Sequence, residues 1–306
     1  MELKVSVFNI GFVIFPQLTQ LDFTGPLQVL ARLPDAATHI VAKSTAPVPS
    51  DCGLSLVPTC PFGSCPTLDL ICIPGGSVGV ADVLRDRETI EFVRRQASGA
   101  KYVTSVCTGA FVLGAAGLLR GRRATTHWAF TDLLPLVGAT HVKSRVVKDG
   151  NLITAGGVTS GIDFGLSVAA ELAGELVAQS IQLGIEYDPA PPFNAGHPDR
   201  APEPAIAALS SRYEKMRDCF VRALPLRSWP DHARGPCWLI EFRSRSATEL
   251  NSDDPPGLAA RRAKLTASRQ GSSSRAEVGI QSVSELRRRV VGIDMDPHRW
   301  RMRVSA

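Results

Sequence analysis

Long apolar runs and an export signal are both missing from this 306-residue sequence. None of its apolar runs approaches the ~18 residues that a membrane-spanning helix needs. The N-terminal segment MELKVSVFNIGFVIFP lacks the basic region and the small-residue cleavage site of a signal peptide. The sequence therefore predicts that this segment holds the first strand, that the chain does not associate with a membrane, and that it is cytoplasmic.

Metal-ligand clusters and CxxC pairs are also lacking. The chain has seven cysteines, an odd number, and in a large chain without an export signal this favours reduced thiols over a disulfide framework. Cys60 and Cys65 are spaced too widely for a CxxC redox or zinc pair, and no second group of cysteines and histidines completes a site. We therefore predict no bound metal.

An excess of basic charge is absent from the main body of the chain. Residues 1–225 hold 19 basic and 20 acidic side chains, whereas residues 226–306 hold 15 and 9. The last amphipathic helix is predicted over 205–224, and beyond Pro225 the sequence becomes polar and rich in serine and arginine. We predict one main domain over 1–225, a basic low-complexity tail over 226–306 that is disordered or irregular, and no nucleic-acid partner.

Strand patterns alternate with helix patterns along the main body. Apolar runs over 7–15 and 68–76, and the segment KYVTSV at 101–106, predict strands buried on both faces. The amphipathic pattern over 81–99 and the stretch rich in Ala, Gly and Leu over 107–121 predict helices. This alternation predicts an α/β fold with a mainly parallel central sheet and helices on both faces.

Three further patterns fix expectations about individual elements. The spacing of leucines over 18–34 predicts a helix with Thr24 as its N-cap and Pro26 in its first turn. Asp149–Gly150 is a turn signal that predicts a hairpin. The apolar periodicity over 158–189 predicts one long helix.

Cys107 is the first candidate functional residue, because it lies where a predicted strand ends and a helix begins. A sharp turn at this point exposes a side chain at the carboxyl end of a sheet, where α/β folds bind ligands. A helix N-terminus lowers the pKa of a thiol, and the N–H of Thr108 can face a developing anion. The alternative is a small buried cysteine with no chemical role, which is common.

Three other segments supply candidate partners for Cys107. Gly75–Gly76 ends a predicted strand and can turn a backbone N–H toward a substrate, although glycine pairs also serve only to turn the chain. Asp22 can hold or transfer a proton, or can be an ordinary acidic residue near a helix start. His127 can act as a base toward the thiol, or can be a packed or capping histidine.

Four segments together resemble the ThiJ/PfpI superfamily: FPQLTQLDFTGPLQVL, ICIPGG, SVCTGAFVLGAAGLLRGRRATTHW and ITAGGVTSGIDFGLSVAAEL. They occur in the order typical of that superfamily and span about residues 7–190. The resemblance implies a flavodoxin-like α/β sandwich like that of class I glutamine amidotransferases. It also implies that the domain over 1–225 is catalytic and forms a homodimer.

Within the superfamily the chain is most similar to the branch that hydrates isonitriles. The run EYDPAPPFNAGHPDRA and the tripeptide DCG at 51–53 also resemble that branch. The resemblance implies hydration to N-substituted formamides through a cysteine-bound thioimidate, without a cofactor, from an isonitrile and water. Cys107 would be the nucleophile, Asp22 would transfer protons and Thr108 would assist by hydrogen bonding.

The resemblance assigns less specific roles to the remaining candidates. Gly76, with its neighbour Gly75, would contribute a backbone donor to the substrate pocket. His127 matches a histidine found in several branches of the superfamily, and its role is secondary to that of Asp22.

Other functions remain compatible with the sequence. A ThiJ/PfpI-like ligand domain also precedes a helix-turn-helix pair in AraC-type transcription regulators, but residues 226–306 lack the expected apolar periodicity. Another enzyme of the superfamily, such as a deglycase-like, chaperone-like or peptidase-like member, is a second alternative. The aspartate at position 22, where other branches use glutamate, speaks against it. A third alternative is a thiol-based redox sensor.

Overall fold

A computed structural model describes residues 7–224. All of them fall within the first of two units into which contacts divide the chain, Met1–Gly235. The predicted tail over 226–306 lies outside the described residues. The homodimer and the cytoplasmic location stay predictions.

The described domain is built on a seven-stranded sheet with the order β10-β11-β7-β6-β1-β2-β5. The strands in chain order are β1 (Phe8–Val13), β2 (Ala36–Ala42), β5 (Cys60–Pro61), β6 (Leu70–Ile73), β7 (Tyr102–Val106), β10 (Val146–Asp149) and β11 (Leu152–Ala155). Every neighbouring pair is parallel except β10 and β11. The apolar strands β1, β6 and β7 therefore lie at the centre, where both faces are buried.

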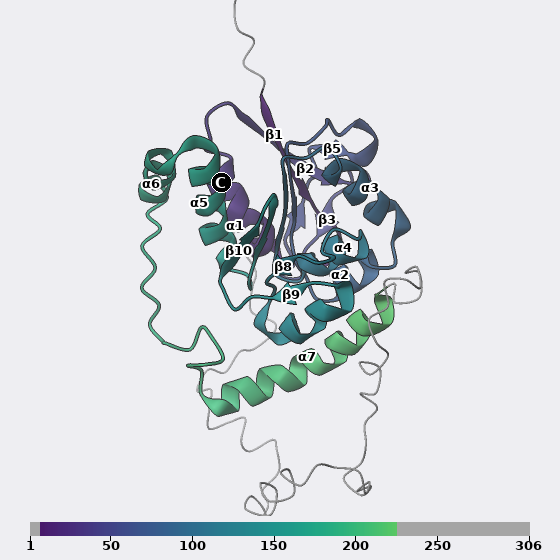
Figure 1. Cartoon of the computed structure of the whole chain (residues 1–306), viewed down its shortest axis with the longest axis vertical. Helices are drawn as coiled ribbons and strands as arrows, with labels where there is room; N and C mark the ends of the chain where they lie inside the picture. Colours follow the sequence, from purple (N-terminus) through teal and green to yellow (C-terminus); the bar gives the residue numbers. More distant parts are fainter. Residues whose placement is uncertain (1–6, 225–306) are drawn as a thin grey trace, which may run out of the picture. The chain divides into compact units, whose positions relative to one another are not determined.

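Helices cover both faces of this sheet (Figure 1). The helices are α1 (Gln20–Leu30), α2 (Val78–Val83), α3 (Arg87–Ala97), α4 (Gly109–Ala115), α5 (Ser160–Ala173), α6 (Glu175–Gly184) and α7 (Glu203–Ala223). Helices α1 and α5 lie on one face, and α2, α3 and α4 lie on the other (Figure 1). The predicted α/β sandwich is confirmed. Within residues 7–224, no helix has both the length and the apolar character required to cross a bilayer.

Short elements complete the domain. Two-residue strands form two small sheets, β3 (Val48–Pro49) with β4 (Ser55–Leu56) and β8 (Arg123–Ala124) with β9 (Thr140–His141). Two 3-10 helices are η1 (Phe62–Ser64) and η2 (Trp128–Val137). Helix α7 packs against α2 and η2, so the C-terminal helix of the described region closes one end of the domain.

The first helix begins earlier than its sequence pattern predicts. Thr19, not Thr24, is its N-cap, and Pro26 lies inside the helix. The Thr24 hydroxyl instead donates to the carbonyl of Gln20, one turn earlier. The chain is tied down before α1 because the Thr19 N–H donates to the Gly75 carbonyl at 2.9 Å. Asp22 consequently lies in the first turn of α1, next to the end of β6.

The prediction of one long helix over 158–189 is wrong, whereas the hairpin is confirmed. The chain forms α5 and α6, which are separated at Gly174 with φ 87°. Such a positive φ is left-handed backbone that interrupts a right-handed helix and that glycine adopts readily. Strands β10 and β11 form the predicted antiparallel pair.

Helices α1 and α5 are in close contact because small residues lie between them. A Cβ added at Gly165 would lie 2.9 Å from the Cβ of Val29, closer than side chains normally approach. This contact holds the start of α5 beside α1, the helix that carries Asp22.

Replacing Gly165 with leucine is expected to lower the free energy of unfolding by about 1–3 kcal/mol, because the larger side chain overpacks the α1–α5 contact. Urea denaturation measures the change. Gly184→Ala is the control, since a Cβ there meets nothing within 4 Å; it should be neutral or stabilise by less than about 1 kcal/mol. Equal stability of the Gly165→Leu and parent proteins would contradict the role given to this contact.

Candidate active site

Cys107 forms a sharp turn between β7 and α4. Its φ is 57°, a left-handed conformation that is uncommon for a residue other than glycine. Its N–H donates to the carbonyls of Ala155 and Gly156, at 3.0 and 2.9 Å, and its carbonyl accepts the Thr126 hydroxyl at 2.8 Å. The cysteine backbone is therefore held in a strained conformation by hydrogen bonds from the β11–α5 loop and from the segment after β8.

Asp22 is a fully buried carboxyl group beside this turn. Its Oδ2 accepts the Gly75 N–H at 3.0 Å. Its Oδ1 is buried and has no hydrogen-bond partner among residues 7–224. Burial raises its pKa to about 7, although hydrogen bonds from the Cys107 thiol and the Gly75 N–H lower it, and the charge of Asp51 adds to the rise. A carboxyl group with this pKa can donate or accept a proton near neutral pH.

The end of β6 has no room for a side chain at residue 75. A Cβ added to Gly75 would lie 2.6 Å from Asp22 Oδ2, 2.7 Å from Cys107 Cβ and 2.7 Å from the Thr108 nitrogen. The Asp22 carboxyl group, the Cys107 side chain and the Thr108 N–H thus surround the α-carbon of Gly75. This absence of a side chain lets Asp22 and Cys107 approach each other.

The thiol of Cys107 is buried, with 5% of the residue exposed. Burial and the charge of Asp22 raise its pKa well above the ordinary value, while hydrogen bonds from the N–H groups of Thr108 and Val158 oppose this rise. The same two N–H groups face the sulfur and stabilise negative charge on it. The prediction that a helix N-terminus lowers this pKa is wrong, because burial and the charge of Asp22 outweigh the donors at the start of α4 and at Val158.

Thr108 connects the turn at Cys107 to Gly76. Its hydroxyl accepts the Gly76 N–H at 3.0 Å and lies 2.8 Å from the Gly76 carbonyl, to which it donates. The Gly75 N–H is likewise engaged, by Asp22. In this arrangement both N–H groups have protein partners, so a Gly76 donor to substrate would have to leave the Thr108 oxygen. The substrate-binding role of Gly75 and Gly76 stays a prediction.

His127 lies at the start of η2 in a cluster of aromatic rings. Its Nδ1 accepts the Ala129 N–H at 3.3 Å, which caps η2, and its ring centroid lies 5.2 Å from that of Tyr213. Burial lowers its pKa to about 4, so the ring is neutral at pH 7. No hydrogen bond joins it to Cys107 in the part of the chain that the structure describes. The packed and capping alternative matches this geometry, and a catalytic role stays a prediction.

Two contributors to the site were not identified from the sequence. Val158 supplies a backbone N–H, a group that every residue except proline has, so its residue type gave no signal; its φ of 23° marks a strained turn. Tyr213 comes from α7 and is close enough to Cys107 for a thiolate charge to raise its pKa, in addition to the effect of burial. The amphipathic pattern of α7 predicted the helix but not this contact.

An open cavity of about 760 Å³ adjoins the site. Thr126, Gly156 and Val158 belong to both its wall and the surroundings of Cys107. The volume is within the range of small-molecule sites.

Comparisons with known proteins agree with this geometry. A model described as the DJ-1/PfpI family matches residues 9–171. Isonitrile hydratase of Pseudomonas putida is 59% identical over 204 residues, which cover 67% of this chain and 89% of that protein. A crystal structure of a ThiJ/PfpI family protein from Pseudomonas syringae is 42% identical with a TM-score of 0.70, covering 73% of this chain and 94% of the other.

A regulator is also among the relatives, at a lower level of similarity. The HTH-type transcriptional regulator GbdR of Pseudomonas aeruginosa (strain UCBPP-PA14) is 26% identical over 191 residues, which cover 59% of this chain and 51% of that protein. The family match covers more than half of the chain, and the hydratase of Pseudomonas putida is matched over most of its length. The resemblance identified in the sequence is confirmed, and this chain belongs to the DJ-1/PfpI family.

Proposed function

We propose that this chain is an isonitrile hydratase, an enzyme that adds water to R–N≡C to give an N-substituted formamide. The observation that carries the proposal is the buried Cys107–Asp22 pair around Gly75. Its electrophile is suggested by the 59% identity to isonitrile hydratase of Pseudomonas putida. Adding water to an isonitrile requires a nucleophile for the terminal carbon, and it places one proton on that carbon and one on the nitrogen. A thiol beside a buried carboxylic acid can supply both functions.

Cys107 and Asp22 act as a pair that holds one proton above pH 7. Burial raises both pKa values, so keeping both groups ionised in this site is unfavourable. With these pKa values, the single proton is on sulfur in the resting pair. The attacking form arises when this proton moves to Asp22 and leaves the charge on sulfur, where the N–H groups of Thr108 and Val158 stabilise it. The protonated carboxyl group is then the acid for the next step.

The first step forms the thioimidate. The sulfur of Cys107 attacks the terminal carbon of the isonitrile, and a C–S bond forms while one C–N π bond is retained as C=N. The electron pair left on this carbon takes the proton of Asp22. The product is R–N=CH–S–Cys107, and Asp22 is now a carboxylate.

The second step consumes water and releases the enzyme. The water oxygen attacks the thioimidate carbon while Asp22 takes a proton from that water. Asp22 then gives this proton to the nitrogen. Asp22 then takes the hydroxyl proton as C=O forms and the C–S bond breaks, which releases R–NH–CHO and a Cys107 thiolate. Atoms and protons balance to one isonitrile and one water, and the pair regains its starting form.

The regulator alternative has less support. The similarity to the GbdR regulator covers about half of that protein at 26% identity. The helix-turn-helix units that such a function requires would fall in residues 226–306, outside the described residues.

Replacing Cys107 with alanine is expected to reduce turnover of cyclohexyl isocyanide to background, because the proposed thioimidate forms on the Cys107 sulfur. Formation of N-cyclohexylformamide measures the reaction. Cys219→Ala is the matched control, since Cys219 is exposed on α7, and it should retain parental activity. An inactive parent, or a Cys107→Ala protein as active as the parent, would defeat the proposal.

The reaction is expected to depend on pH through Asp22. Below its pKa of about 7 the pair carries two protons and lacks an attacking sulfur; above it the pair carries one. Thus kcat/KM should rise between about pH 5 and 9, with a midpoint near 7. Asp22→Asn should lower kcat/KM by at least ~100-fold. A flat profile, or one that falls through pH 7, rules out the one-proton pair.

Stability should report the same carboxyl group independently of turnover. The pKa of Asp22 is about 7 when folded and near 3.8 when unfolded, so the folded state binds more protons between these values. Its contribution to stability is complete below about pH 4 and is lost as pH rises to about 7. Asp22→Asn should remove this part of the pH dependence of the free energy of unfolding, as urea titrations can measure. An unchanged dependence would refute the raised pKa.

Gly75→Ala is expected to lower kcat/KM by ~100-fold or more, because the new methyl group separates Asp22 from Cys107 and removes proton transfer. Gly63→Ala is the matched control, since a Cβ there meets nothing within 4 Å. Steady-state kinetics, with circular dichroism to check folding, measure the effect. Parental activity in a folded Gly75→Ala protein would be inconsistent with the proposed geometry.

A further inference from the structure

The charged residues that line the cavity beside Cys107 are mostly cationic. Among its lining residues, Lys143, Arg145 and Arg200 are cationic, whereas Asp199 is the one carboxylate. Burial and the charge of Lys143 lower the pKa of a fourth lining group, His141, so this imidazole is neutral at pH 7. The lining therefore favours an anionic ligand.

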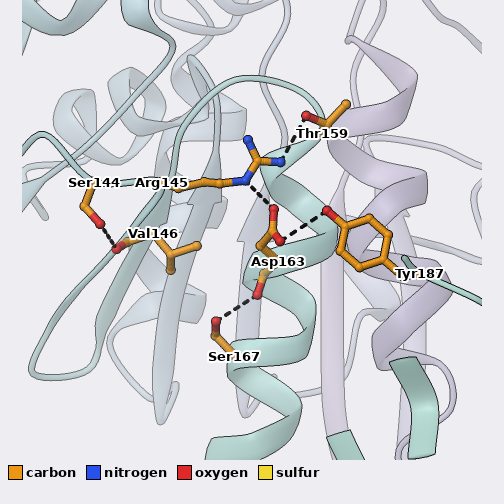
Figure 2. A network of polar contacts seen from close by, with 7 residues as sticks. All are labelled: Ser144, Arg145, Val146, Thr159, Asp163, Ser167 and Tyr187. Atoms are coloured by element: carbon orange, nitrogen blue, oxygen red, sulfur yellow. Dashed lines mark hydrogen bonds and ion pairs between the residues drawn. The ribbon is translucent and has the colours of Figure 1, made fainter. Parts of the chain in front are cut away.

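Two of these cations already have protein partners. Arg145 forms an ion pair with Asp163 and donates to the Thr159 hydroxyl at 3.1 Å, while Tyr187 donates to the other oxygen of Asp163 at 3.2 Å, as Figure 2 shows. This network fixes Arg145 in the wall and holds the loop that carries Val158. The Lys143 ammonium lies 2.5 Å from the Asp199 carboxylate.

Arg200 is the remaining cation of the lining, and it has no ion pair among the described residues. Its guanidinium forms no ion pair or hydrogen bond with any residue between 7 and 224, although its charge helps to lower the pKa of Asp199 after the larger effect of Lys143. The residue is exposed. Its backbone is nevertheless held, because the Arg200 N–H donates to the His197 carbonyl at 3.0 Å. A guanidinium on a fixed backbone offers a carboxylate two parallel N–H donors.

The cavity and the reacting atoms share one wall. Val158 lines the cavity while its N–H faces the sulfur of Cys107, and Thr126 lines it while its hydroxyl binds the Cys107 carbonyl. An isonitrile reacts through its terminal carbon, so its substituent extends away from the sulfur. Because Val158 and Thr126 border both the cavity and the surroundings of Cys107, we place the substituent in this cavity.

We propose that the enzyme takes isonitriles whose substituent carries a carboxylate, and that Arg200 binds that carboxylate. This inference rests on the proposed hydratase function and names its substrate class. The carboxylate takes no part in bond making. It raises kcat/KM by binding and orienting the substrate in the cavity while the isonitrile carbon reacts with Cys107.

Paired substrates test the charge preference. Isocyanoacetate and its homologue with one more methylene are each compared with the neutral methyl ester, and cyclohexyl isocyanide serves as a neutral reference. The parent should have a higher kcat/KM for each carboxylate than for its ester. Arg200→Gln should lower the carboxylate-to-ester ratio about twofold to fivefold, the range of an exposed ion pair.

Charge variants and salt sharpen the comparison. Arg200→Lys should keep most of the preference, and Arg200→Glu should lower the ratio by about tenfold or more, because attraction becomes repulsion. Arg87→Gln, which removes an exposed cation on α3 outside the cavity, should leave the ratio unchanged. Raising the salt concentration from about 0.02 to about 0.5 M should lower the ratio in the parent and have less effect in Arg200→Gln.

The outcomes separate this inference from the function beneath it. Turnover of cyclohexyl isocyanide and the esters, with a ratio that neither Arg200→Gln nor Arg200→Glu changes, would overturn the carboxylate site and leave the hydratase function intact. Failure to turn over any of the isonitriles would refute the hydratase function and the inference with it. A ratio lowered equally by Arg87→Gln would show a general charge effect and also overturn the assignment to Arg200.

Discussion

The rest of this domain depends on one contact, in which the carboxyl group of Asp22 and the thiol of Cys107 lie side by side and buried from solvent. Removing a carboxylate from water is unfavourable unless the group is neutralised or hydrogen-bonded, so the pKa of Asp22 rises to about 7. The same burial, together with the charge of Asp22, raises the pKa of Cys107. In the proposed mechanism Asp22 and Cys107 form a unit that carries one proton above pH 7 and moves it between sulfur, carboxyl group and substrate.

Maintaining that unit requires four separate segments to meet. Asp22 comes from the first turn of α1, Gly75 from the end of β6, Cys107 from the β7–α4 turn and Val158 from the β11–α5 loop. In a parallel sheet the carboxyl ends of neighbouring strands lie at one edge, which brings the last three together. The close contact of α1 with α5 at Gly165 holds the remaining segment, the first turn of α1 with Asp22. The positive φ values of Cys107 and Val158 are strain that the surrounding hydrogen bonds and core sustain.

The sequence predicts those parts of the site that depend on residue type, and not those that depend on backbone geometry. Buried strands such as β6 and β7 are evident from their apolar runs, and Cys107 and Asp22 are candidates because a thiol and a carboxyl group have distinctive chemistry. The Val158 N–H has no such signature. The sequence predicted the wrong start for α1, because threonine is a common N-cap residue and Thr24 precedes a run of apolar residues. The hydrogen bond from Thr19 to Gly75 decides instead where the helix begins. Apolar periodicity likewise continued across Gly174, where one backbone angle ends α5.

The electrostatic character of the site changes between the reacting atoms and the cavity. Cys107 and Asp22 are buried, so together they hold a single negative charge, because a second charge would lack solvation. In the cavity beyond Val158 the cations are solvated, and they act over a longer range and with smaller energies. A substituent that binds there can raise affinity without adding charge to the Cys107–Asp22 pair. Substrate preference can therefore change through Arg200 and its neighbours while the proton transfer, which depends on Gly75 and the buried pair, stays the same.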